Sequence, residues 1–346
     1  MGAIVECVPN ISEGRDLAKI HRIADTVKTV RGVTLLDVDP NGDYNRSVIT
    51  YAGEPEACVE ATFRLTRAAY EEIDMTRHKG SHPRSGAVDV APFVPVRGIR
   101  MAECAELARQ LGKRVGQELQ VPVYLYEAAA SQPGRTNLAR VRKGEYEALE
   151  EKLKDAQWAP DFGPAKFMPT FGCLITGARF FLVAYNVNLK TEDENVAQDI
   201  ALHVREMGWP IKDRQGEEVL SATGKKVFHP GPLLNVKGMG VYLDRDKFCQ
   251  ISMNLTNYLV TGPHIAFEQA KHEAASRGVD VNGSEVVGLI PLQAVLLAAE
   301  YFVWRDRLAR PASEREAVQL AHDKLEFSAY RPFDPHKKII EYAIVN

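Results

Sequence analysis

The sequence lacks the features that mark secreted, membrane-spanning and nucleic-acid-binding proteins. Its 5 cysteines are an odd number without a C-x-x-C pair, so we expect buried, reduced thiols rather than disulfides or a zinc clamp. There is no apolar run of about 18 residues, the length a membrane helix needs, and no basic-then-apolar signal segment at the start. With 43 Lys and Arg against 46 Asp and Glu, the chain has no basic excess for nucleic-acid binding. We therefore expect a cytoplasmic protein whose partners are small molecules, not nucleic acids or membranes.

What is present is the composition of a large globular protein. Apolar residues make up 45% and charged residues 26% of the 346 residues, which argues against disorder and coiled coil. A chain of this length usually divides into more than one core. We expect two subdomains, at residues 1–178 and 179–346.

The first half has a readable order of elements. Short β-branched runs predict strands, and apolar residues at spacings of three and four predict helices. Pro92 and Pro95 predict that the last of these strands lies at a sheet edge or is irregular. The predicted β-α-β-β-α-β order consists of 3–9, 16–30, 33–39, 46–52, 55–70 and 87–96.

The second half repeats this order, with a polar excursion at 208–231 after the first helix. The repeat predicts an α+β fold of two ferredoxin-like (βαββαβ) subdomains with a ligand cleft between them. Outside the repeat we expect helices at 101–115, 145–153 and 317–325, a strand at 123–126 and an extended tail at 339–345. The predicted elements of the second unit are 173–188, 196–204, 236–243, 249–255, 263–274 and 285–291.

The densest polar loop, at 74–89, is the first candidate site. His78 and His82 have an H-x3-H spacing that would suit a metal on a helix, but Gly80 argues against a helix there. A solvated loop that only caps a helix is a second reading. In the third, a histidine exchanges protons near neutral pH while Lys79 and Arg84 hold a small carboxylate ligand.

A second unusual loop, at 161–177, is rich in phenylalanine, glycine and proline. Linkers usually avoid phenylalanine. An aromatic-lined cleft would suit a flat heterocycle. The alternative is that Phe162, Phe167 and Phe171 belong to an ordinary interdomain core.

With these loops considered, the chain resembles the formiminotransferase family along almost its whole length. The matching stretches share sequence rather than composition alone. They are Cys-Val-Pro-Asn-Ile-Ser-Glu-Gly-Arg at 7–15, Leu-Leu-Asp-Val-Asp at 35–39, Arg-His-Lys-Gly-Ser-His-Pro-Arg at 77–84, Asp-Phe-Gly-Pro at 161–164, Thr-Gly-Ala-Arg at 176–179, Gly-Ser-Glu-Val-Val-Gly-Leu-Ile-Pro-Leu at 283–292 and Ile-Ile-Glu-Tyr at 339–342.

The resemblance implies two α/β subdomains, a folate cleft and transfer of a formimino group between N-formimino-L-glutamate and N5 of tetrahydrofolate, in histidine degradation. It implies a catalytic role for His82, assistance from Asp39 and a homodimer, with no metal. Lys79 and Arg84 are our candidates for binding the glutamate carboxylates. The stretch that the resemblance assigns to folate consists of Gly163, Pro164, Ala165, Lys166, Phe167, Met168, Pro169, Thr170, Phe171 and Gly172.

Two alternatives remain open at the level of sequence. Formyl transfer between 5-formyltetrahydrofolate and glutamate replaces one nitrogen of the transferred group by oxygen, and no sequence feature separates it from formimino transfer. A non-catalytic folate-binding protein would not need a titratable group in the 77–84 motif. We also expect no cyclodeaminase half, because the sequence given has no room for it after residue 346.

Overall fold

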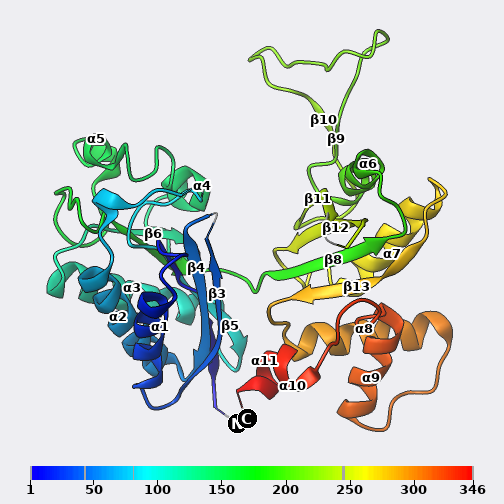
Figure 1. The fold of residues 1–346 in the computed structure, drawn as a ribbon, viewed down its shortest axis with the longest axis horizontal. Helices are drawn as coiled ribbons and strands as arrows, with labels where there is room; N and C mark the ends of the chain where they lie inside the picture. The colour runs from blue at the N-terminus through cyan, green and yellow to red at the C-terminus, as the bar shows by residue number, and fades with distance from the viewer. Residues whose placement is uncertain (1, 43, 81, 244–245, 345–346) are drawn as a thin grey trace. The chain divides into compact units, whose positions relative to one another are not determined.

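The computed structural model describes residues 2–42, 44–80, 82–243 and 246–344. These form two compact units, Met1–Phe180 and Phe181–Asn346, each with its own sheet and helices (Figure 1). The mixed α+β class predicted from the sequence is confirmed. The cleft between the units stays a prediction.

The first unit contains the predicted β-α-β-β-α-β order and continues beyond it. Its long helices begin at polar or proline residues: Asp16 accepts a hydrogen bond from Lys19 N at 3.0 Å, and Pro55 occupies a first-turn position. The elements are β1 (Ile4–Cys7), β2 (Asn10–Ile11), α1 (Leu17–Lys28), β3 (Val33–Asn41), β4 (Arg46–Gly53), α2 (Pro55–Glu72), η1 (Met75–Arg77), β5 (Val88–Arg97), α3 (Met101–Glu118), β6 (Val123–Glu127), η2 (Pro133–Arg135), α4 (Leu138–Val141), α5 (Leu149–Lys152), η3 (Ala156–Trp158) and β7 (Leu174–Ala178).

The sheet of the first unit has β5 in its interior. Strands β1 and β2 lie between β4 and β5 and pair antiparallel with both, whereas β7 pairs parallel with β5 and continues to β6. The expectation of an edge strand at Pro92 and Pro95 is therefore wrong. The alternative expectation of irregularity holds, because the pairing with β5 shifts register between Ile4 and Val5 and again between Asn10 and Ile11.

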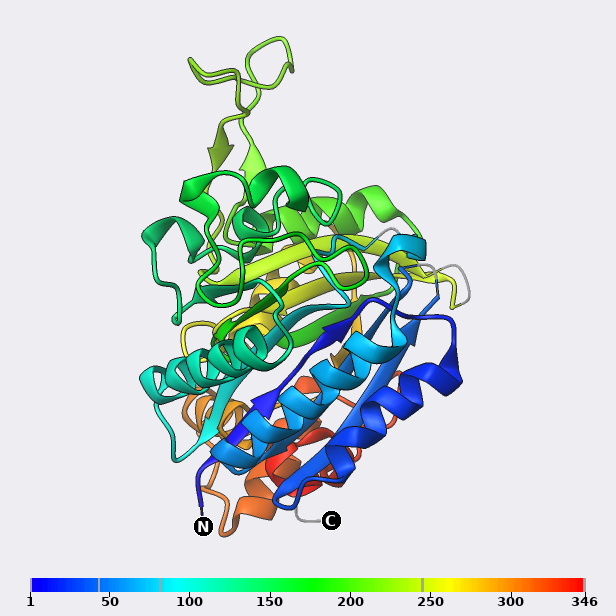
Figure 2. The same cartoon turned by 90° about the vertical axis from the view of Figure 1, so that its left-hand side faces the viewer.

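One face of this sheet carries the main core, and a smaller core covers part of the other face. Helices α1, α2 and α3 lie side by side on the first face (Figure 2), where alternate β4 residues such as Ile49 and Tyr51 are fully buried. On the second face, the segment 138–153 covers β5, β6 and β7 through a smaller core that includes Tyr124 and Leu149. Arg46, on β4, points to this second face because side chains alternate along a strand.

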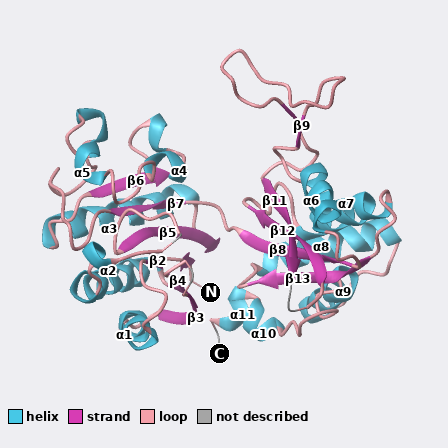
Figure 3. Ribbon diagram, turned by 45° about the horizontal axis from the view of Figure 1, so that its top comes forward, coloured by secondary structure: helices cyan, strands magenta, loops and turns pink. Residues whose placement is uncertain are grey.

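The second unit has a four-stranded sheet in the order β11-β12-β8-β13. Its first and last strands, β8 and β13, lie side by side and pair antiparallel. Figure 3 shows the long hairpin that extends beyond β9 and β10. The elements are β8 (Val183–Leu189), α6 (Glu194–Val204), β9 (Trp209–Pro210), β10 (Phe228–His229), β11 (Val236–Leu243), β12 (Phe248–Leu255), α7 (Pro263–Ala275), β13 (Val281–Val287), α8 (Leu292–Asp306), α9 (Glu314–Leu325), α10 (Pro335–Lys338) and α11 (Ile340–Ala343).

Several predicted elements differ from those observed. The single strand expected at 173–188 is two strands, β7 and β8, which belong to different sheets. Helix α8 is not predicted from the sequence, although its sequence is largely apolar and good at forming helices. The tail at 339–345 is helical at Ile340–Ala343 rather than extended, and its last residue lies outside the described residues. Residues 244 and 245, between the strands expected at 236–243 and 249–255, also lie outside the described residues.

No helix in the described part of the chain is both long enough and apolar enough to span a bilayer.

A buried ion pair fixes the start of the loop that follows η3. The Arg135 side chain is 2% exposed and donates from Nη1 to Asp161 Oδ2 at 2.8 Å, while its Nη2 donates to the carbonyl of Ala159 at 2.8 Å. Asp161 also accepts from Leu125 N at 2.8 Å. The carboxylate therefore connects β6, η2 and the loop.

We predict that Asp161→Ala destabilises the first unit by about 3–5 kcal/mol, because it leaves the buried Arg135 charge without its carboxylate partner. The measurement is the free energy of unfolding in urea, followed by circular dichroism. The control is Asp25→Ala, which removes the partner of Lys28 in a pair whose side chains are 60% and 55% exposed and should change stability little. Equal effects of the two variants would contradict the prediction.

Candidate active site

The loop that carries His82 is tied to the predicted folate stretch by backbone hydrogen bonds. Met75 N donates to Thr170 O at 2.9 Å, and Ala87 N donates to Phe171 O at 2.7 Å. Between these bonds the backbones cross closely, with an isolated antiparallel bridge between Gly86 and Gly172. Two segments that are far apart in the sequence, one on either side of these bonds, are thus held next to each other in the first unit.

Asn45 connects this loop to the turn between β3 and β4. Its side-chain oxygen accepts from Gly14 N at 2.9 Å, and its side-chain nitrogen donates to Lys79 O at 3.0 Å. Its own carbonyl accepts from His78 Nε2 at 2.9 Å. Asn45 has φ 49°, a left-handed conformation that asparagine tolerates better than most residues. The 78–80 backbone and the β3–β4 turn are therefore held together by one buried side chain.

Arg84 is buried and engaged by protein groups at every guanidinium nitrogen. It makes a bidentate pair with Glu147 at 2.9 and 2.6 Å, contacts Glu145 at 3.2 Å and donates from Nε to His78 Nδ1 at 3.2 Å. Because His78 Nδ1 accepts that bond, Nε2 carries the proton and donates to Asn45 O. Burial lowers the pKa of His78, which fits this neutral form.

His82 lies half-buried in a strongly positive environment. Burial, followed by the charges of Arg46, Arg142 and Arg84, lowers the pKa of His82 to about 4. The ring centroid is 6.3 Å from that of Tyr44, and no described residue hydrogen-bonds to its ring nitrogens. His82 is therefore neutral at pH 7 and has its nitrogens available to a substrate.

Asp39 reaches the same neighbourhood through Arg46. Asp39 is exposed on β3, where it pairs with Val48 of β4, and Arg46 is paired two residues further along. Both side chains point to the same face of the sheet, and the Asp39 charge acts on the Arg46 guanidinium. Asp39 and His82 are thus linked by a shared cationic neighbour.

The four predicted site residues in these two motifs differ in their exposure to solvent and in the ion pairs that they already make. Lys79 is exposed, and its ammonium pairs with no carboxylate in the described ranges. Arg84, by contrast, is only 8% exposed at its side chain and is already bound by Glu145 and Glu147. The structure thus brings His82, Asp39 and Arg46 together, while Arg84 faces protein carboxylates.

The predicted folate stretch, 163–172, begins at a surface cavity and ends against the His82 loop. Gly163 and Pro164 help to line a cavity of about 420 Å³, together with residues from the carboxyl-terminal part of α3. Further along, Tyr146 donates to Pro169 O at 2.5 Å, and its ring lies 5.5 Å from that of Phe167. Phe171 is fully buried in the main core of the first unit, while the interdomain core that the alternative reading expected stays a prediction.

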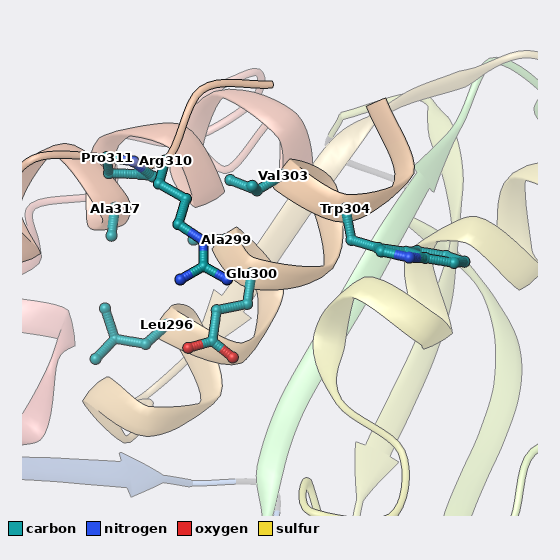
Figure 4. Close-up of a pocket in the computed structure, with 8 residues that line it drawn as sticks. All are labelled: Leu296, Ala299, Glu300, Val303, Trp304, Arg310, Pro311 and Ala317. Atoms are coloured by element: carbon teal, nitrogen blue, oxygen red, sulfur yellow. The ribbon is translucent and has the colours of Figure 1, made fainter. Parts of the chain in front are cut away.

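A separate cavity of about 500 Å³ lies in the second unit, beside α8 (Figure 4). In this view Glu300 and Arg310 are drawn near one another, while Trp304, which is 78% exposed, points away from them. No residue predicted from the sequence lines this cavity. It is lined by Leu296, Ala299, Glu300, Val303, Trp304, Arg310, Pro311 and Ala317.

Within the described ranges, no three His, Cys, Asp or Glu side chains are grouped so that they could hold a metal ion. His78 uses both ring nitrogens in protein hydrogen bonds, so it has no lone pair to offer as a ligand. The segment that would have to be helical for an H-x3-H site is irregular at 78–80.

Comparison with known proteins matches both units of the chain to models of one family. The family model described as "Formiminotransferase domain, N-terminal subdomain" matches residues 4–179, and that described as "Formiminotransferase domain" matches residues 184–345. The chain belongs to the formiminotransferase family. The resemblance seen in the sequence motifs is thereby confirmed.

Its relatives in this family include separate and fused proteins. The chain is 43% identical over 303 residues to "Glutamate formimidoyltransferase" of Streptococcus pyogenes serotype M1, covering 88% of this chain and 94% of that one. It is 44% identical over 303 residues to the protein of the same name from Thermoplasma acidophilum, covering 87% and 92%. It is 46% identical to "Formimidoyltransferase-cyclodeaminase" of Dictyostelium discoideum over 99% of this chain, but spans only 61% of that relative.

The candidate site of this formiminotransferase-family chain includes residues that no sequence motif indicated. Tyr44 and Asn45 come from the β3–β4 turn, Arg46 is the first residue of β4, and Arg142 follows α4. In the sequence these residues follow the strand expected at 33–39, and nothing local connects them to His82. The charge neighbours of His82 become visible only once β4 is placed beside the 78–86 loop.

We predict that Gly172→Ala destabilises the formiminotransferase chain more than a comparable glycine replacement elsewhere in the first unit. Gly172 has φ 83°, and an added Cβ would lie 2.2 Å from Ser85 O. The matched control is Gly98→Ala, because Gly98 has φ 64° but its nearest atom would be 3.4 Å away. In the control, only the left-handed backbone conformation lowers the stability, by roughly 1–2 kcal/mol. The measurement is the free energy of unfolding of both variants in urea. Equal losses of stability would contradict the close approach of Gly172 to Ser85.

We also predict that His82 titrates near pH 4 and that Arg46→Gln raises its pKa toward 6.5. Removing a nearby positive charge makes protonation of the imidazole less costly. The measurement is a pH titration of the histidine ring signals by NMR, assigned with His82→Gln. Arg67→Gln is the control, since Arg67 pairs with Glu118 and its charge is not among those that act on His82. A pKa for His82 that is the same in wild type and Arg46→Gln would contradict the prediction.

Proposed function

We propose that this protein is a glutamate formimidoyltransferase. It transfers the formimino group between N-formimino-L-glutamate and N5 of tetrahydrofolate, giving 5-formiminotetrahydrofolate and L-glutamate, as a step in histidine degradation. The observation that carries the proposal is a neutral, accessible His82 within a cationic site, in a chain 43% identical to a relative of that name along nearly its whole length.

His82 acts as general base and then as general acid. N5 of tetrahydrofolate attacks the amidine carbon, and the C–N bond that forms gives a tetrahedral intermediate. His82 accepts the proton that N5 loses and delivers it to the nitrogen of glutamate as the original C–N bond breaks. One imidazole can perform both steps because the proton leaves one nitrogen and arrives at another on the same carbon. Asp39 is placed to influence this site through Arg46.

The remaining residues have separate roles in this proposal. The stretch 163–172 binds the folate co-substrate, next to the His82 loop to which it is hydrogen-bonded. Lys79 is free to attract an anionic substrate. Arg84 acts as a positioning residue, because Glu147 and Glu145 already occupy its donors and its Nε fixes the tautomer of His78.

The cellular setting belongs to the same proposal. We expect a cytoplasmic enzyme that forms homodimers and needs no metal. Its 5 cysteines are all buried free thiols, which suits a reducing compartment.

We predict that His82→Gln lowers kcat by roughly 10²- to 10⁴-fold with N-formimino-L-glutamate and tetrahydrofolate, while folate affinity stays close to that of wild type. The assay follows 5-formiminotetrahydrofolate by its absorbance, and folate binding is measured by calorimetry. The control is His21→Gln, which changes an exposed histidine on α1 and should keep full activity.

The same assay separates the alternatives. Unchanged turnover in His82→Gln would overturn the proposed role of His82. A strong preference of the wild type for 5-formyltetrahydrofolate and glutamate would favour formyl transfer. Folate binding without turnover of either donor would indicate a binding protein.

A further inference from the structure

The proposed reaction places one carboxylate of the donor next to His82. In N-formimino-L-glutamate, the nitrogen that leaves is bonded to the α-carbon, and the α-carboxylate is bonded to that same carbon. The side chain that protonates this nitrogen and the side chain that binds the α-carboxylate must therefore be close neighbours. The γ-carboxylate is three carbons away from the α-carbon and does not impose this requirement. A cation beside His82 is therefore the group to look for.

Three guanidinium groups act on His82, and within the part of the chain that the structure describes two of them pair with carboxylates while the third does not. Arg84 is bound by Glu145 and Glu147. Arg142 pairs with the buried Asp89 at 2.5 Å. Arg46 has no carboxylate within ion-pair distance among the described residues, and its charge is the largest electrostatic influence on His82.

The fold fixes the position of Arg46 but leaves a hydrogen-bond donor of its guanidinium unpaired among the described residues. Arg46 follows Asn45, the side chain that fixes the β3–β4 turn to the 78–80 backbone, and it is the first residue of β4. Its Nε is inaccessible to solvent and has no hydrogen-bond partner among the residues that the structure describes, and burial lowers the pKa of its guanidinium. A buried donor that is left unpaired costs stability. A ligand that accepts from this group would remove that cost.

Arg46 and His82 have Tyr44 as a common neighbour. The Tyr44 ring centroid lies 5.9 Å from the guanidinium carbon and 6.3 Å from the His82 ring centroid. Asp39 acts on the guanidinium from β3, and Asp89 acts on it from β5, but neither makes a direct ion pair with it. Planar guanidinium groups bind carboxylates with paired hydrogen bonds, which also fixes orientation.

We propose that Arg46 binds the α-carboxylate of the amino-acid donor and so orients its leaving nitrogen toward His82. This inference rests on the proposed function and adds a specificity: donors are α-amino-acid derivatives, and the α-carboxylate rather than the γ-carboxylate is read at this point. Arg84, which the sequence suggested for a substrate carboxylate, is replaced in that role by Arg46.

The test compares two donors in wild type and Arg46→Gln. One donor is N-formimino-L-glutamate, and the other is N-formimino-4-aminobutyrate, which lacks only the α-carboxylate. With the first, Arg46→Gln lowers kcat/KM by roughly 100-fold; with the second, it lowers kcat/KM by less than about threefold. Arg46→Lys recovers part of the activity with the first donor only. Arg109→Gln, which alters an exposed arginine paired with Glu106, is the control for an arginine-to-glutamine change.

This design separates the binding role from a structural or electrostatic one. Any change in the pKa of His82, or any local unfolding, would affect both donors equally. An equal loss with both donors would therefore overturn the assignment of Arg46. A second arm needs no turnover: calorimetry should show weaker binding of L-glutamate to Arg46→Gln, with binding of 4-aminobutyrate unchanged.

The two proposals fail in different ways. If wild type does not transfer the formimino group but Arg46→Gln still loses L-glutamate binding selectively, the proposed function is wrong and the carboxylate site stands. If wild type transfers the formimino group, and wild type and Arg46→Gln bind L-glutamate equally well, the assignment of Arg46 is wrong and the proposed function stands.

Discussion

The geometry of the candidate site depends on one buried guanidinium. Arg84 is held by Glu147 through two hydrogen bonds, and its Nε donates to His78. That bond fixes the tautomer of His78, whose other nitrogen then donates to the carbonyl of Asn45. Because Asn45 immediately precedes Arg46, this chain of hydrogen-bonded side chains also helps to determine where Arg46 lies. Breaking any member would leave a buried polar group unpaired, so the chain is held as a unit.

The positive charges of the candidate site are balanced unevenly by protein carboxylates. Arg84 and Arg142 are neutralised by carboxylates, whereas His82 and Arg46 have no ionic partner among the described residues. The positive field is therefore strongest where no protein carboxylate balances it. A site of this kind attracts an anion more strongly than an exposed lysine on a loop would, because burial weakens solvent screening.

Sequence patterns predicted the parts of the molecule that depend on local spacing. The periodic runs of α1 and α2 and the strand pair β3–β4 are present where apolar spacing indicated, and the His82 loop is identified by its motif. What could not be predicted depends on residues far apart in the chain. Arg84 and Glu147 are separated by 63 positions, so their pairing has no local signal, and Arg84 was interpreted as free. Arg46 was overlooked for the same reason, since its relation to His82 exists only after β4 and the 78–86 loop are brought together.

A low pKa and a role in proton transfer are compatible at His82 if the substrate completes the charge balance. In the free protein, burial and three arginines hold the pKa of His82 at about 4, so the imidazole is neutral and ready to accept a proton. A carboxylate bound at Arg46 would offset part of that positive field and raise the pKa of the imidazole. The base would then be strongest when the donor is in place, and the imidazolium would be stable enough to form yet acidic enough to protonate the leaving nitrogen. On this view the unpaired state of Arg46 keeps His82 neutral until the donor binds.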